Sequence, residues 1–199
     1  MSEKIQNFIK NEKGNLLVNL AKEAFIYYLK EQKRIDKIYI YDELKEKRGV
    51  FITLKKIERD REKSIVSMGY PLPEKPLFHS VIDSAIACAN KARILNLLGE
   101  IESIILEVSV LGNIEEIQTE RRVDYPKQIK LGQDGIMIER GFQRALILPQ
   151  VPLENEWNEI DLLSECCLKA GLSPDAWLDE DTRIYKFKTR VFRCIFRCK

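Results

Sequence analysis

Residues 129–177 read IKLGQDGIMIERGFQRALILPQVPLENEWNEIDLLSECCLKAGLSPDAW, and this stretch decides the fold. Its first half contains two runs rich in apolar residues, 134–139 and 142–148, which meet at the sequence Glu139-Arg140-Gly141. A glycine at such a junction is typical of the tight turn in an antiparallel hairpin. We therefore predict a pair of antiparallel strands in this half.

The second half of the same stretch carries the start and stop signals of a helix. Asn158 can accept hydrogen bonds from the first free backbone N–H groups, as N-cap residues do. Gly171 suits the end of the helix, because Lys169 lies in the last turn and Pro174 just beyond it. The pattern predicts a helix over 158–171.

Outside this stretch the chain alternates between helical and extended patterns. Apolar residues recur at helical spacing over 15–32 and over 76–93, where Pro76 suits the first turn. Strands are expected at 48–56, 64–70, 103–111 and 184–195. Helices and antiparallel hairpins are interspersed without a β-α-β rhythm, so the predicted class is α+β.

The length of 199 residues allows one domain, or two small lobes. The β-β-α-β pattern over 46–115 predicts one subdomain. Residues 1–45 and 116–199 together are expected to form the second, with antiparallel hairpins and packed helices in the whole.

Charge and hydropathy exclude several classes. The net charge of +2 gives no global attraction to nucleic acid. No apolar run approaches the ~18 residues that span a bilayer, so no membrane association is expected. The first residues, MSEKIQNFIKNEKG, include acids and lack a long apolar region, which argues against a signal peptide and favours a cytoplasmic location.

The five cysteines form no CxxC pair, and the only histidine is His79. We therefore predict reduced thiols, no metal site and no cofactor.

Several unusual motifs occur along the chain, namely Leu148-Pro149-Gln150-Val151, Trp157, the run 167–172, Trp177, RGVFITL at 48–54 and GYPLPEKPL at 69–77. Together they resemble the archaeal branch of the AMMECR domain family. The resemblance implies one AMMECR-type domain, with an α+β fold of two subdomains and a cleft that family residues line. It implies no settled biochemical activity.

The chain departs from the family in its signature, Leu-Arg-Gly-Cys-Ile-Gly, which falls on residues 64–69. Only Gly69 is retained. Ile65 stands at the arginine position and Ser67 at the cysteine position. The chain therefore lacks both the arginine that could bind an anion through two hydrogen bonds and the cysteine that could act as a strong nucleophile. Asp134 stands where many relatives carry histidine, and it is a further candidate cleft residue. Whether the protein is an enzyme is left open.

Five residues near the signature and the following strands are candidates for a site, namely Ser67, Gly69, His79, Asp83 and Glu107. Ser67 could be a nucleophile or a structural strand serine, because no elbow motif surrounds it. His79 and Asp83 are spaced i, i+4 and could hydrogen-bond as a base and its orienting acid, or form a surface pair. Glu107 interrupts an apolar strand, so it is either a cleft acid or the partner of a cation such as Arg48 or Arg93.

Three further candidates match family positions. Arg48 could bind a phosphate or carboxylate, or lie solvated in its charged surroundings. Thr53 belongs to the same strand motif. Gln150 could use its amide in the cleft, or tie down a loop.

The last expected strand is basic. Alternation places Lys186, Lys188 and Arg190 on one face, which could follow a phosphate backbone or protect an edge strand against aggregation.

The sequence leaves three hypotheses for function. They are a cleft protein that binds a small molecule or peptide segment, a nucleic-acid-associated module using this basic face, and a non-catalytic partner of another protein.

Overall fold

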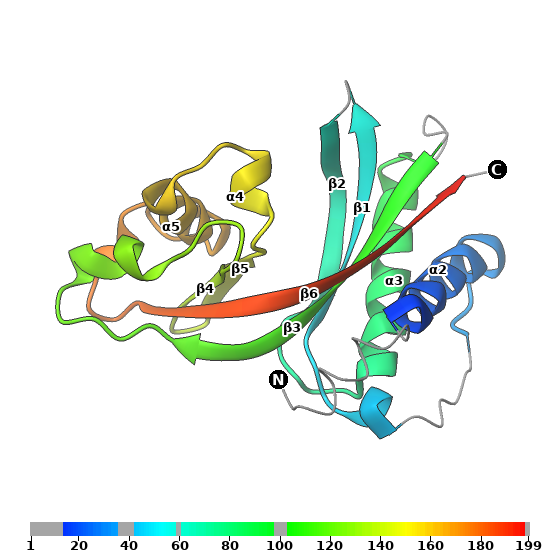
Figure 1. Ribbon diagram of the computed structural model, residues 1–199, viewed down its shortest axis with the longest axis horizontal. Helices are drawn as coiled ribbons and strands as arrows, with labels where there is room; N and C mark the ends of the chain where they lie inside the picture. The colour runs from blue at the N-terminus through cyan, green and yellow to red at the C-terminus, as the bar shows by residue number, and fades with distance from the viewer. Residues whose placement is uncertain (1–13, 36–41, 59–60, 98–102, 198–199) are drawn as a thin grey trace. The chain divides into compact units, whose positions relative to one another are not determined.

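The chain folds into two compact units in a computed structural model, which describes residues 14–35, 42–58, 61–97 and 103–197 (Figure 1). Unit 1 contains Met1–Leu111 and Arg190–Lys199, and unit 2 contains Gly112–Thr189.

The described strands pair in the order β2-β1-β3-β6-β4-β5. Strand β1 is antiparallel to β2 and β3, and β4 is antiparallel to β5 and β6. Helices combined with antiparallel pairing confirm the predicted α+β class. The strands are β1 (Val50–Glu58), β2 (Arg61–Tyr70), β3 (Ser103–Glu116), β4 (Gly135–Arg140), β5 (Gln143–Ile147) and β6 (Arg183–Arg197).

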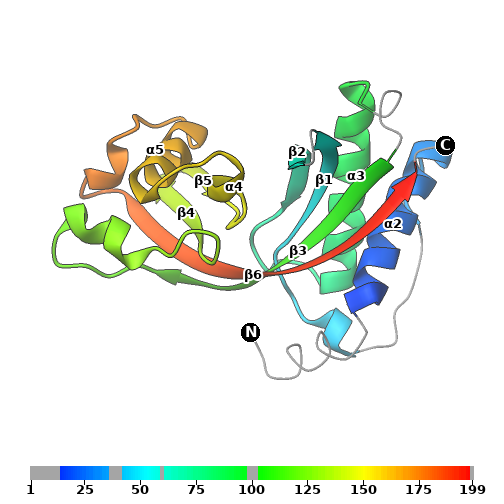
Figure 2. The same ribbon diagram turned by 45° about the horizontal axis from the view of Figure 1, so that its top comes forward.

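Strand β1 shows how unit 1 is packed, because successive side chains of a strand point to opposite faces. Val50, Ile52 and Leu54 are fully buried in a core cluster with helices α2 (Gly14–Glu31) and α3 (Leu77–Ile94). Both helices cover the same face of these strands (Figure 2). In the described part of unit 1, the opposite face of β1 carries no helix.

Helix α2 belongs to unit 1, whereas the sequence analysis placed residues 1–45 in the other subdomain. Its apolar stripe packs against α3, and Leu17, Leu20 and Phe25 are buried in the core cluster of unit 1. An amphipathic stripe predicts that a helix packs, but the stripe alone does not identify its partner. The end of β6 also falls in unit 1 rather than in the predicted second subdomain.

Unit 2 contains the predicted hairpin and capped helix. Strands β4 and β5 meet at Gly141, whose φ of +58° suits the tight turn. Helix α5 (Glu159–Lys169) packs on both strands and buries Leu162 and Leu163 in a second core cluster, together with Trp177. The short helices are α4 (Val151–Glu154), η2 (Arg122–Gln128) and η3 (Ala176–Leu178) in unit 2, and η1 (Asp42–Lys45) in unit 1.

The N-terminus of α5 is closed by a capping box. The side chain of Asn158 accepts hydrogen bonds from the backbone N–H groups of Ile160 (2.9 Å) and Asp161 (3.0 Å). The carboxylate of Asp161 accepts in return from the backbone N–H of Asn158 at 3.0 Å. The cap predicted at Asn158 is thus confirmed, and its bonds satisfy N–H groups that the helix itself cannot pair.

Substituting Asn158 by alanine should lower the free energy of unfolding by about 1 kcal/mol, because the cap bonds are lost. Urea unfolding monitored by circular dichroism measures the change. Ser164→Ala in the interior of the same helix is the matched control, and it should not destabilise the protein, since alanine has the higher helix propensity. Equal stabilities for the two variants would contradict the role of the cap.

Candidate functional site

A polar row crosses three neighbouring strands on the helix-free face of unit 1. Ser67 of β2 pairs with Thr53 of β1, and Thr53 pairs with Glu107 of β3. The hydroxyl oxygens of Ser67 and Thr53 are 2.9 Å apart and hydrogen-bonded. Thr53 and Glu107 are buried, whereas Ser67 is exposed. Because directly paired residues share a face, the strand register alone brings three predicted site residues together.

Glu107 forms a buried ion pair with Lys55, the fourth member of the polar row. Lys55 Nζ lies 3.2 Å from Glu107 Oε2, and each side chain is only 5% exposed. Each charge alone would be costly to bury, so the pair depends on both partners. The sequence analysis expected a cation beside Glu107, such as Arg48 or Arg93, and the structure places Lys55 there. Sequence reasoning missed it as a site residue, although alternation from Thr53 places it on the same face.

The ion pair continues toward the surface of unit 1. Glu62 Oε2 lies 4.0 Å from Lys55 Nζ, and Glu62 Oε1 lies 2.9 Å from Nη1 of Arg193 on β6. The Glu62 and Arg193 side chains are more exposed than the Lys55–Glu107 pair. The buried ion pair Lys55–Glu107 is therefore followed by a more exposed ion pair, Glu62–Arg193.

Ser109 adds a buried hydroxyl to the same face, since it pairs with Phe51, two residues before Thr53. Ser109 is fully buried, and its Oγ has no hydrogen-bond partner within the described residues. Buried hydroxyls in native proteins are normally hydrogen-bonded. A water or ligand group at this position would remove the cost of the missing bond.

Two signature positions have structural explanations. A Cβ atom on Gly69 would lie 2.1 Å from the carbonyl oxygen of Val50 and 2.7 Å from ring atom Cγ of Phe51, so close strand packing requires glycine. Ile65 lies at the register shift between β1 and β2 and packs against the core of unit 1. The position of the family arginine is thus used for an apolar contact.

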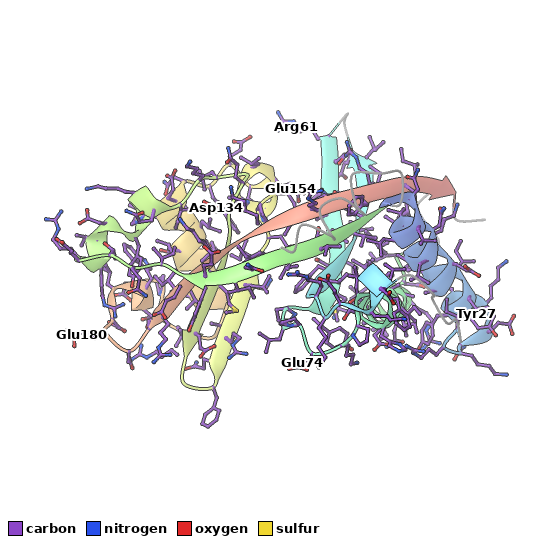
Figure 3. The ribbon with its side chains drawn as sticks, turned by 60° about the horizontal axis from the view of Figure 1, so that its bottom comes forward. Tyr27, Arg61, Glu74, Asp134, Glu154 and Glu180 are labelled. Carbon is purple, nitrogen blue, oxygen red and sulfur yellow. The ribbon has the colours of Figure 1, made fainter. Side chains whose placement is uncertain are left out.

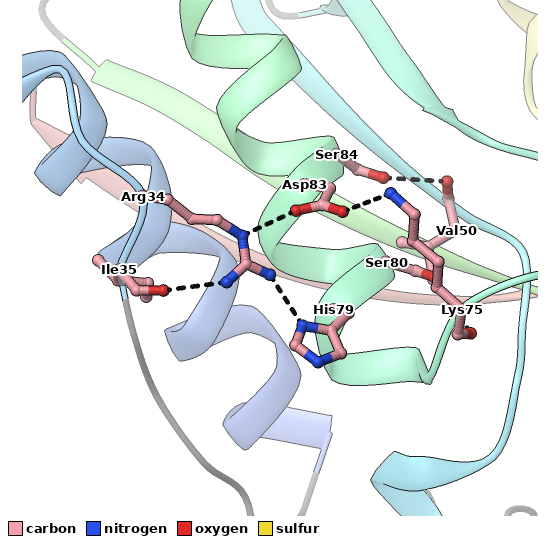
Figure 4. Close-up of polar contacts among 8 residues, drawn as sticks. All are labelled: Arg34, Ile35, Val50, Lys75, His79, Ser80, Asp83 and Ser84. Carbon is pink, nitrogen blue, oxygen red and sulfur yellow. Dashed lines mark hydrogen bonds and ion pairs between the residues drawn. The ribbon is translucent and has the colours of Figure 1, made fainter.

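Arg34 organises a second polar cluster in unit 1, made of Arg34, Lys75, His79 and Asp83 (Figure 4). Arg34 Nε donates to Asp83 Oδ1 at 3.1 Å, and Arg34 Nη2 donates to His79 Nδ1 at 2.8 Å. Lys75 Nζ donates to Asp83 Oδ2 at 2.7 Å. His79 and Asp83, predicted to contact each other, are both bound by the guanidinium of Arg34. Because a guanidinium can only donate, His79 Nδ1 must accept.

The cluster keeps Asp83 ionised. Burial acts to raise the pKa of Asp83, but hydrogen bonds from Lys75 and Arg34 outweigh it and lower the pKa. The hydrogen bond to Asp83 raises the pKa of Lys75 in turn. The arrangement is that of a stable charge network, and a general base would need its carboxylate less occupied.

Three predicted residues lie apart from both groups. Arg48 precedes β1 and its Nη2 lies 3.3 Å from Glu46 Oε2. Asp134 (Figure 3) belongs to unit 2, where its carboxylate accepts from the backbone N–H of Lys130 at 2.9 Å and so ties the turn before β4. Gln150, also in unit 2, directly precedes α4, and its backbone oxygen accepts from the N–H of Glu154 at 3.1 Å.

The basic residues Lys186, Lys188 and Arg190 lie on β6, and their environments differ. Lys186 Nζ donates to the backbone oxygen of Gln128 at 3.1 Å, which gives this lysine a structural contact. Lys188 is exposed and Arg190 is half-buried. Nucleic-acid binding by this strand stays a prediction.

Within the described ranges, no group of three or more histidine, cysteine or acidic side chains could hold a metal ion. A search of the same ranges for a helix long and apolar enough to cross a membrane finds none.

Cysteines in both units are held as thiols by their surroundings. Burial raises the pKa of Cys88 and of Cys166 to about 12, and that of Cys167 to about 11. Burial also raises the pKa of Cys194. A raised pKa suppresses the thiolate, which is the reactive form. Cys198 lies outside the described residues.

Replacing Glu107 by glutamine should destabilise unit 1 by about 3 to 5 kcal/mol, because the buried charge of Lys55 would lose its 3.2 Å counter-ion and keep the more distant, partly exposed Glu62 at 4.0 Å. The double variant Lys55→Met/Glu107→Leu should recover most of this loss, since both charges are removed. Urea unfolding measures the free energy of unfolding of the unsubstituted protein, the single variant and the double variant. Glu58→Gln is the control, because Glu58 pairs with Lys56 at the surface (3.3 Å) and should matter by less than about 1 kcal/mol. If Glu107→Gln lowered the free energy of unfolding no more than Glu58→Gln does, the buried ion pair would not have the role assigned to it.

Cys88, Cys166 and Cys167 should resist alkylation in the folded protein. At pH 8 a thiol with a pKa of 11 or above is thiolate in about one part in a thousand or less. Peptide mapping by mass spectrometry after brief iodoacetamide treatment should find these residues unmodified, and modified once urea is added. Rapid labelling of any of them in the native protein would show that the thiol is active after all.

Comparisons with known proteins agree with the resemblance seen in the sequence. The chain is 40% identical to Protein MK0488 of Methanopyrus kandleri, over 91% of this chain and 88% of that protein. It is 43% identical to Protein PYRAB00100 of Pyrococcus abyssi, over 92% and 91% of the two chains. The crystal structure of the uncharacterized protein PH0010 from Pyrococcus horikoshii matches with a TM-score of 0.81 and 38% identity, covering 94% of this chain and 96% of that one. The AMMECR1 family model matches residues 18–192, and the chain therefore belongs to the AMMECR1 family.

Proposed function

We propose that the protein binds a small molecule or peptide segment through an amide-like group at the polar row of unit 1. The observation that carries the proposal is the buried Lys55–Glu107 pair beside the exposed hydroxyl of Ser67. An amide presents a donor and an acceptor side by side. The polar row offers the complementary set, because Glu107 accepts, Lys55 donates and the hydroxyls do both.

The burial of the pair supports binding for a physical reason. Hydrogen bonds made in a low-dielectric site are electrostatically stronger than those made in water. Lys55 and Glu107 are already desolvated and hold each other in place, so little ordering cost remains for a ligand to overcome.

The same geometry supports binding more than catalysis. A serine nucleophile needs a neighbouring general base, and the hydroxyl that Ser67 contacts is that of Thr53, which is not a base. The signature thiol and arginine are absent. The proposal therefore assigns a ligand class and no reaction. A cytoplasmic location, expected from the sequence, is part of it.

The proposal is tested by NMR titration of the ¹⁵N-labelled protein with a panel of N-acetyl amino-acid amides and short peptides. Binders should shift the amide signals of Thr53, Ser67 and Glu107. Ser67→Ala should weaken binding about three- to tenfold, as expected for the loss of one hydrogen bond. The control Ser164→Ala in unit 2 should leave affinity unchanged.

Two results would contradict the proposal. One is a set of shifts that leaves the polar row unaffected, and the other is equal affinity of the Ser67→Ala variant and the unsubstituted protein. Ser67 is exposed on strand β2, so its substitution leaves the core intact and the readout reports on binding.

A further inference from the structure

Strand β2 is an edge strand, and its only partner among the described strands is β1 (Figure 1). An edge strand presents N–H and C=O groups that a further strand can bind. The charged side chains of Arg61 and Lys63 and the register shift at Ile65 protect the first half of β2 against such pairing. Residues 66–70, Val-Ser-Met-Gly-Tyr, contain no charge and no proline. This half of the edge lacks those protections.

The other edge strand, β5, differs from β2. It has only five residues, and one of them is the charged Arg144. The backbone oxygen of Leu146 accepts a hydrogen bond from Lys169 Nζ of α5 at 3.0 Å. A short, charged edge with a side chain bound to its backbone is poorly suited to strand addition. Strand addition is therefore expected at β2.

The hydrogen bonds of β1 show which of its backbone groups point to β3. The backbone N–H of Leu111 donates to the oxygen of Gly49 at 2.9 Å, and the register places these two residues opposite each other. Hydrogen-bonded pairs alternate with non-bonded pairs in an antiparallel ladder. Thr53, four residues after Gly49, therefore bonds to β3, whereas its neighbour Ile52 bonds to β2.

The same alternation identifies the backbone groups at the open edge. Ile52 pairs with Met68, so the N–H and C=O of Met68 face β1. The N–H and C=O groups of Ser67 and Gly69 consequently point outward. The contact between the hydroxyls of Ser67 and Thr53 agrees, because side chains lie closest in non-bonded pairs. Within the described residues, no backbone–backbone hydrogen bond reaches these outward groups.

The two faces beside this edge differ in polarity. Ser67 is exposed on the face of the polar row. On the opposite face, Met68 packs against the core of unit 1 and Tyr70 is 40% exposed. A strand added to β2 meets hydroxyls on one side and apolar side chains on the other. An extended segment with alternating polar and apolar residues fits both.

We propose that β2 binds an extended, uncharged peptide segment of another protein as an additional antiparallel strand. The backbone groups of Ser67 and Gly69 hold the backbone of the segment, and its polar side chains lie on the face of the polar row. Recognition of this kind takes its affinity from main-chain hydrogen bonds and its specificity from alternate side chains.

A second copy of the chain fits this edge less well than a peptide does. Two copies of β2 could pair only over 66–70, because Pro71 follows at one end and the register shift lies at the other. Five paired residues on each side fall short of the roughly 20 residues a side that a stable interface uses. A short segment needs only these few bonds for a transient complex.

Amide hydrogen exchange followed by NMR tests the backbone geometry. In the free protein the amides of Ser67 and Gly69 should exchange at least about tenfold faster than that of Met68, which is bonded to β1. Saturating peptide should slow the exchange of Ser67 and Gly69 about tenfold or more and leave Met68 little changed. Protection of Ser67 and Gly69 without any peptide would show that the edge is already occupied and would overturn the proposal.

The probe is the acetylated and amidated pentapeptide Thr-Val-Thr-Val-Thr, whose two residue types suit the two faces. In the proposed pairing the threonines lie opposite Ser67 and Gly69, and their N–H groups point to β2. N-methylation of the central threonine should weaken binding at least about tenfold, because it removes one such N–H and places a methyl group at the edge. N-methylation of the valine before it is the matched control and should change affinity less than about threefold, since that N–H points away from β2. Equal affinities of the two methylated peptides would overturn the proposal.

Two substitutions at one position locate the edge on the protein. Ser67→Pro removes the outward N–H without breaking a bond to β1, and edge strands accept proline in this orientation. It should weaken pentapeptide binding at least about threefold more than Ser67→Ala, which keeps the N–H and loses only the hydroxyl. Equal losses from both variants would contradict strand addition. If Ser67→Pro disturbs folding, the two methylated peptides give the same decision with the unsubstituted protein.

The inference rests on the proposed function, and the two can fail separately. If the methylated peptides do not differ while Ser67→Ala still weakens the binding of amide ligands, strand addition is wrong and the polar row remains the binding site. If the methylated peptides differ as expected while Ser67→Ala has no effect, the edge of β2 holds the peptide without the polar row.

Discussion

The alternation of side chains along β1 is the constraint on which unit 1 depends. Apolar residues at every second position pack against α2 and α3, so the intervening residues must face away from the helices. A shift of register by one residue would place Lys55 in the apolar core and Ile52 or Leu54 on the polar face. The same register that builds the core thus places Thr53 between Ser67 and Glu107.

Strand pairing and core packing explain which residues of the family signature are kept and which are replaced. Gly69 is retained because the backbone of β1 and the ring of Phe51 leave no room for a side chain. Ile65 contributes to the core, and Ser67 hydrogen-bonds to the neighbouring strand. The chain therefore keeps what the strand pairing requires and changes the groups that would carry thiol or arginine chemistry. The remaining polar character of the face comes from the Lys55–Glu107 pair.

Features with local causes could be predicted from the sequence, and features with distant partners could not. The hairpin turn at Gly141 and the cap at Asn158 depend on residues only a few positions apart, so the local sequence was enough to predict both. The position of α2 depends on a helix far along the chain. Likewise, Arg34 meets His79 across 45 positions, and no spacing rule connects them. Glu107 was recognisable as a carboxylate that needed a cation, but Lys55 was identified only through the strand register.

The place of β6 in the strand order has a consequence for how the protein is made. This strand is the last of the described elements, yet it lies between β3 and β4. During synthesis both of these strands have an open edge until residues 183–197 leave the ribosome. Until then the nascent chain must be protected from pairing of these open edges with other strands. Contacts between β6 and strands formed much earlier also raise the contact order, which slows folding.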